Sequence, residues 1–177
     1  MKKITKPNYT EHAVYYEPFI AKVSTHISVL DQLRDQQAEV LALLKNTELP
    51  WLNRPYAPNK WTILDIVQHL IDCERVFVYR AMRFARNDRS PLPFFNENEF
   101  ALEARKNGLT AKRLAKEFKT NRQATLAFYS HLSAAVLKRE GIASQFTMSV
   151  RASVWIIAGH ERHHLDVIRE RYPLSEK

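Results

Sequence analysis

Two histidines one helical turn apart are the strongest chemical signal in the sequence. His160 and His164 stand at positions i and i+4 of the run His160-Glu161-Arg162-His163-His164. On an α-helix this spacing puts the two imidazoles about 40° apart around the axis, one above the other. Both can then reach one metal ion at about 2.0–2.1 Å. We predict that they are metal ligands; the alternative is a pair of structural core histidines.

A metal site of this kind needs a third ligand from elsewhere in the chain. His69 lies in the middle of another apolar helical segment, at the edge of its apolar arc, and is the best candidate. Three neutral imidazoles leave one position of a tetrahedral zinc ion open, which is typical of catalytic sites. We expect one divalent ion, zinc by preference, with nickel, copper or iron as alternatives. Three others are interpreted as ordinary surface or core histidines: His12, His26 and His131.

Three further side chains near these ligands have open roles. His163 lies about 60° to the side of His160 on the helix, so it could support a ligand or transfer protons as a general base. It is our candidate catalytic residue. Cys73 follows His69 by one turn and is expected to be a small buried residue, although it could lie near the ion. For Glu161 we expect a solvated residue or one that supports a ligand.

The same run also fits a different enzyme class. His160-Glu161-Arg162-His163-His164 matches H-E-x-x-H, the zinc-protease helix in which the glutamate is the general base. Against this interpretation, no metzincin-type third histidine follows, and His69 already offers a third ligand from upstream. The sequence also predicts no strand that could hold an extended peptide. We therefore do not favour a protease.

Helical periodicity accounts for the elements that must position these residues. Apolar residues recur at three- and four-residue spacing in long helices expected over residues 18–46, 62–87, 110–138 and 149–172, with a short helix over 96–106. Thr62 followed by Asp65 is a variant of the capping box at a helix start. Four long helices and a short one predict an all-α four-helix bundle with one extra short helix, forming a single domain over residues 1–177. The cores of such bundles are also where metal sites are commonly built.

Composition limits the function classes. Three glycines in the whole chain argue against a sheet-and-turn fold, and the single Cys73 fits a reducing compartment. No leader peptide is visible and no apolar run approaches the roughly 18–20 residues of a membrane span, so we expect a cytoplasmic protein with no membrane partner. The net charge of +8 is spread evenly, which makes nucleic acid an unfavoured partner. Its densest cluster is expected to be a solvated helix face: Arg75, Arg80, Arg83, Arg86 and Arg89.

Two stretches resemble the DinB-like superfamily, which includes the bacterial YfiT-type thiol transferases. One is Asn59-Lys60-Trp61-Thr62-Ile63 leading to His69, and the other is His160-x-x-His163-His164. The resemblance implies a four-helix bundle, dimeric in many members, with a zinc- or nickel-type ion on His69, His160 and His164. The activities it implies are transfer of a low-molecular-weight thiol such as bacillithiol to electrophiles, and mycothiol-dependent isomerisation.

The sequence thus favours an enzyme in which a metal ion activates a low-molecular-weight thiol or water for attack on a small electrophilic substrate, as a transferase or a hydrolase. A thiol co-substrate and a homodimer are part of this expectation. Two other hypotheses remain. One is a non-catalytic metal or small-molecule binding protein of the stress response. The other is nucleic-acid association through four arginines: Arg75, Arg80, Arg83 and Arg86.

Overall fold

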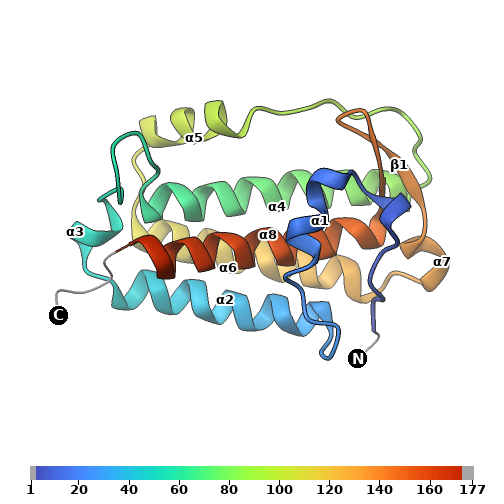
Figure 1. Cartoon of the computed structure of the whole chain (residues 1–177), viewed down its shortest axis with the longest axis horizontal. Helices are drawn as coiled ribbons and strands as arrows, with labels where there is room; N and C mark the ends of the chain where they lie inside the picture. Colours follow the sequence, from blue (N-terminus) through green and yellow to red (C-terminus); the bar gives the residue numbers. More distant parts are fainter. Residues whose placement is uncertain (1–2, 173–177) are drawn as a thin grey trace.

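Four long helices lie side by side in the computed structural model, which describes residues 3–172 (Figure 1). They are α2 (Val29–Asn46), α4 (Ile63–Ala85), α6 (Ala111–Ser130) and α8 (Val150–Arg171). Around the bundle, α2 and α4 each pack against both α6 and α8. The predicted four-helix bundle is confirmed. Pro173, expected just past the last helix, lies outside the described residues.

Short elements join and cover these helices. The predicted short helix is present as α5 (Glu97–Lys106), capped by Asn96, and Gly108 just beyond it has φ +66°. The other short helices are η1 (Tyr9–Glu11), η2 (Val14–Tyr16), α1 (Glu17–Ile20), α3 (Leu49–Leu52) and α7 (Ala134–Leu137). In the described part of the chain, no helix is both long and apolar enough to cross a membrane.

Two of the expected long helices are interrupted. The helix expected over residues 18–46 stops after α1 and restarts at Ser28, whose side chain accepts a hydrogen bond from the Leu30 amide. Gln32 holds the intervening loop, because its side chain bonds both the amide and the carbonyl of Ser24. The helix expected over 110–138 ends at Ser130, and Ser133 caps α7 beyond it. In both cases a serine side chain competes with the continuing helix for backbone groups.

The expectation of no strand is wrong. β1 (Glu140–Ala143) and β2 (Phe146–Ser149) form an antiparallel hairpin at one end of the bundle. Its two-residue turn places Ser144 and Gln145 at φ +52° and +73°, values for which a hairpin usually uses glycine or asparagine. Because the turn contains neither glycine nor asparagine, the usual sequence signal for a hairpin is absent at this position.

The chain reaches the bundle arrangement by a long crossover. After α4 it runs back along the bundle, and α5 lies beside α4 (Figure 1). Arg105 at the end of α5 pairs through two hydrogen bonds of 2.6 Å with Asp65 at the start of α4. Asp65 also forms the predicted capping box with Thr62. One carboxylate thus fixes both the start of α4 and the return of the chain.

A polar layer crosses the middle of the bundle. The buried apolar residues fall into two clusters, which on α4 change over after Ile71 and on α8 after Ala158. Between the clusters each long helix contributes a buried polar side chain: Gln36, Glu74, Arg122 and Glu161. The three histidines of the predicted metal site stand at the same level of α4 and α8.

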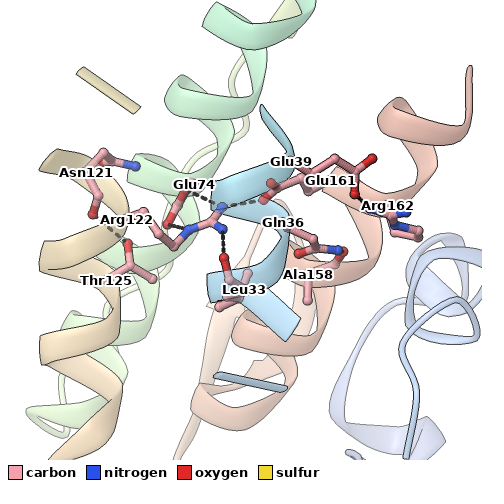
Figure 2. A network of polar contacts seen from close by, with 10 residues as sticks. All are labelled: Leu33, Gln36, Glu39, Glu74, Asn121, Arg122, Thr125, Ala158, Glu161 and Arg162. Atoms are coloured by element: carbon pink, nitrogen blue, oxygen red, sulfur yellow. Dashed lines mark hydrogen bonds and ion pairs between the residues drawn. The ribbon is translucent and has the colours of Figure 1, made fainter. Parts of the chain in front are cut away.

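Arg122 is the centre of this layer (Figure 2). It donates from Nε and Nη2 to Glu74 at 2.9 and 3.0 Å, from Nη1 to the Leu33 carbonyl at 2.6 Å, and from Nη2 to Glu161. These partners belong to α4, α2 and α8, while Arg122 belongs to α6. One guanidinium therefore bonds to the other three long helices, with about 1% of its surface exposed.

Arg122→Met should destabilise the fold strongly, because it leaves two carboxylates buried without a counter-charge. We expect a loss of about 3–5 kcal/mol in the free energy of unfolding, measured by urea denaturation. The control is Arg75→Met, which removes an exposed arginine paired with Glu117 and should cost under about 1 kcal/mol. Equal effects of the two substitutions would contradict the central role of Arg122.

A second buried ion pair attaches the N-terminal segment to α8. Glu11 accepts hydrogen bonds of 2.7 Å from Arg151 Nε and from Ser149 Oγ, and one of 3.1 Å from the Asn8 amide. Burial alone would raise the pKa of Glu11, but these bonds and the charge of Arg151 outweigh it and lower the pKa to about 2.

Glu11→Gln should therefore lower stability at neutral pH and change its pH dependence. A carboxyl group whose pKa falls on folding stabilises the protein above its unfolded pKa, and that contribution disappears as the pH falls from about 4.5 to about 2. We expect the variant to be about 2–3 kcal/mol less stable than the wild type at pH 7. The difference should shrink over this pH range in denaturation curves. A difference independent of pH would show that Glu11 is not held as a carboxylate.

Candidate metal centre

The structure brings the three predicted ligands together. His69 on α4 and His160 and His164 on α8 direct their Nε2 atoms to one point, with His160 Nε2 lying 3.0 Å from that of His69 and 3.1 Å from that of His164. Their ligand atoms all lie within 4.8 Å of one another. Three nitrogens bound tetrahedrally to zinc would lie about 3.3 Å apart. The donor set and its spacing therefore fit one divalent ion.

Helix starts and helix packing place these side chains. The capping box of Thr62 and Asp65 fixes the first turn of α4, two turns before His69. Ser149 caps α8 by accepting a hydrogen bond from the Ala152 amide. The contact between α4 and α8 then brings His69 opposite the histidine pair, because both helices turn their apolar stripes to the core.

Burial keeps the three imidazoles uncharged. It lowers the pKa of His69 to about 4 and that of His164 to about 3, and it holds the pKa of His160 well below its usual value. The neighbouring imidazoles lower the pKa of His160 and His164 further, since one positive charge would repel another. Neutral histidines present free lone pairs, which a metal ion requires.

Cys73 behaves as the small buried residue that we predicted. It is 3% exposed, and its Sγ lies 3.5 Å from Nδ1 and 3.7 Å from Nε2 of His69. Burial raises the pKa of the thiol, which favours its uncharged form. The thiol is thus a neighbour of the cluster and fills space beside His69.

A cavity of about 510 Å³ opens over the histidines. His69, His160, His163 and His164 line it, and the Trp61 ring lies 4.6 Å from that of His69, centroid to centroid. Seven further lining side chains are aromatic: Tyr15, Tyr16, Phe19, Phe77, Phe94, Phe95 and Phe146. Helical periodicity does not predict this cavity lining, because its residues come from the N-terminal segment, the crossover and the hairpin as well as from α4. An organic molecule suits such a wall better than a purely inorganic ion.

His163 faces the same cavity as the three candidate ligands. It is half-buried, and its ring centroid lies 5.2 Å from that of His164 and 5.4 Å from that of Phe19. Burial lowers its pKa, so the ring is uncharged and able to accept a proton. His163 is not one of the three histidines whose ligand atoms converge, which agrees with a side chain beside the candidate site rather than a fourth ligand, and the catalytic role remains a prediction.

Glu161 does not face this cavity. It is 1% exposed and pairs with Arg122 in the core, so the expectation of a solvated residue is wrong. Burial, and next the charge of Glu74, raise the pKa of Glu161 to about 7 against the opposing effect of Arg122. A zinc-protease glutamate must reach a water on the metal. The geometry thus gives the H-E-x-x-H interpretation no support.

The surroundings of the cluster include a close helix contact, and the three other histidines lie apart from it. A Cβ on Gly159, the residue before His160, would collide with the Phe19 carbonyl, so this glycine makes room for α1. His12 is buried, with Nδ1 at 3.1 Å from the Ala13 carbonyl oxygen, and His26 and His131 are exposed. None of the three joins the cluster.

The arginine cluster of α4 is not a uniform solvated face. Arg75 and Arg83 pair with Glu117 and Asp88 near the surface, but Arg80 is 2% exposed and lines the cavity. The expectation of a solvated face is therefore wrong for Arg80. Its position eleven residues after His69 places it on the same helix face, which is the signal that the sequence offered.

Comparisons with known proteins agree with this fold. The family model of the DinB superfamily matches residues 32–168. A search of curated proteins finds no match. Among solved structures, the chain is similar to YfiT from Bacillus subtilis, described as a probable metal-dependent hydrolase with an unusual four-helix bundle topology. The TM-score is 0.73 at 16% sequence identity, over 84% of this chain and 90% of that chain.

Loss of a single imidazole should empty the proposed metal site. We expect tag-free wild-type protein to contain about one divalent ion per chain by inductively coupled plasma mass spectrometry. His69→Ala and His160→Ala should lose it, while His131→Ala, an exposed control, should keep it. If wild-type protein contains no metal and takes up none on titration, the three histidines are packed core residues and not metal ligands.

Proposed function

The chain belongs to the DinB superfamily, and from that premise we propose that it is a metal-dependent enzyme. In this proposal His69, His160 and His164 hold one divalent ion, zinc by preference and nickel or iron as alternatives. Water or a low-molecular-weight thiol is the nucleophile, and a small organic electrophile is the substrate.

The convergence of three Nε2 atoms on the wall of an aromatic cavity carries this proposal. Three protein ligands leave a coordination position open, which separates catalytic from structural zinc sites. The ion would supply Lewis acidity and lower the pKa of a water or thiol in that position. The likeness to a probable metal-dependent hydrolase supports the hydrolytic form of the proposal.

The protein's own residues have separable tasks. The aromatic side chains of the cavity, with Trp61 beside His69, would bind the apolar part of the substrate and exclude water around the reacting group. His163, uncharged and facing the same space, would accept the proton of the nucleophile. Arg122, paired with Glu74 and Glu161, would keep α4, α6 and α8 in register below the histidines.

Turnover assays on a panel of substrates test the proposal. Zinc- or nickel-loaded protein is incubated with aryl esters, epoxides and 1-chloro-2,4-dinitrobenzene, in water alone and with cysteine, glutathione or coenzyme A. We expect one pairing to turn over and His160→Ala to abolish it. His163→Gln should keep its metal and lower kcat by roughly 10²–10⁴-fold, whereas His131→Ala should match the wild type.

A non-catalytic binding protein is the competing function. A chain that holds one ion and is inert with every electrophile and nucleophile of the panel would favour it. Full activity in His163→Gln would be compatible with the proposed metal site but would show that His163 does not accept the proton of the nucleophile.

A further inference from the structure

Arg80 is a buried positive charge without a carboxylate partner. Its Nη2 donates hydrogen bonds to the Pro93 carbonyl at 2.9 Å and to Ser144 Oγ at 2.8 Å, and both acceptors are neutral. The salt bridges among residues 3–172 do not include Arg80. Hydrogen bonds to these neutral oxygens satisfy the donors of Nη2 but leave the charge itself uncompensated.

The other buried arginines of the described chain have carboxylate partners. Arg122 pairs with Glu74 and Glu161, and Arg151 pairs with Glu11. A buried guanidinium is costly unless an anion compensates it. Arg80, at 2% exposure, thus stands out as a site where an anion from outside the chain would supply the missing charge.

Arg80 lies in the same cavity as the candidate metal ligands. His69, Cys73, Phe77 and Arg80 follow one another at successive turns of α4, and all four line the cavity. Eleven residues separate His69 from Arg80, a rise of about 16 Å along the helix. One wall of the cavity therefore carries the histidines near one end and the guanidinium near the other.

The surroundings hold the guanidinium in place. Pro93 belongs to the crossover after α4, and Ser144 belongs to the hairpin turn, so two separate loops fix Nη2. The rings of Phe77 and Phe95 lie 5.8 and 5.6 Å from its Cζ, centroid distances that allow cation–π contact. A charge fixed in this way loses little conformational entropy when it binds an anion.

We propose that Arg80 binds the carboxylate of a small organic substrate whose reactive atom lies at the three histidines. The aromatic wall between the two ends would hold the apolar part of that molecule. Arg80 is the one lysine or arginine among the cavity-lining residues in the described chain, so it suits a monoanion better than a phosphate dianion. Glu97, which also lines the cavity, is not paired with Arg80 and disfavours a second negative charge.

This inference rests on the proposed function for the identity of the reacting group, but its test does not need turnover. Isothermal titration calorimetry compares 4-phenylbutanoate with its neutral isostere 4-phenylbutanamide, on the full chain as purified and after metal removal with EDTA. We expect the carboxylate to bind about tenfold more tightly than the amide in both states. Arg80→Gln should abolish this preference and leave amide binding unchanged.

The matched control is Arg83→Gln, which removes an arginine one turn further along α4 that pairs with Asp88. It should retain the full preference. Equal binding of carboxylate and amide by the metal-free wild type would overturn the proposal. So would a preference that needs the metal and survives in Arg80→Gln, because the ion itself would then hold the carboxylate. A phosphate monoester that binds more tightly than the carboxylate would overturn the substrate class.

If Arg80→Gln does not fold, a measurement on the wild type tests whether Arg80 binds the carboxylate. The side-chain ¹⁵Nε resonance of Arg80 should shift on addition of 4-phenylbutanoate and stay unchanged with the amide; the absence of a shift at saturation would overturn the proposal. A preserved carboxylate preference in a protein inert in every turnover assay would uphold the Arg80 site and reject the proposed catalysis.

Discussion

A single buried guanidinium sets the arrangement of the bundle. Arg122 reaches from α6 to a carbonyl of α2 and to carboxylates of α4 and α8, in a layer that separates two apolar clusters (Figure 2). Apolar packing tolerates a helix that slides or rotates a little, because many contacts are nearly equivalent. A buried ion network does not tolerate such a displacement, since each buried charge left without its partner is costly. This layer therefore fixes the register of the helices.

The candidate metal centre depends on that register. His160 precedes Glu161 on α8, and His69 lies five residues before Glu74 on α4, so the network and the imidazoles lie within about one and a half helical turns of each other. A displacement of α8 by one residue would rotate its histidines by about 100° away from His69. The ion pairs that hold Glu74 and Glu161 thus also hold the three nitrogens near one point.

Arg122 and Arg80, both buried, illustrate different uses of the same side chain. Arg122 is compensated by carboxylates and joins helices, whereas Arg80 meets neutral oxygens and aromatic faces at the edge of a cavity. A compensated charge in the core fixes the fold, and an uncompensated one beside open space favours an incoming anion. With neutral histidines at the other end, the cavity has two chemically distinct ends separated by an apolar wall.

Local patterns in the sequence determined the parts of this protein that depend on neighbours along the chain. The i, i+4 pair of His160 and His164, the cap at Thr62 and the apolar stripes follow from helical geometry alone, and His69 followed from its place on such a stripe. The bond of Arg122 to Glu161, the burial of Arg80 and the hairpin turn at Ser144 join segments that are distant in sequence. The spacing from His69 places Arg80 on the same helix face, but only the tertiary structure decided these contacts and this burial, because they depend on which segments pack against each other.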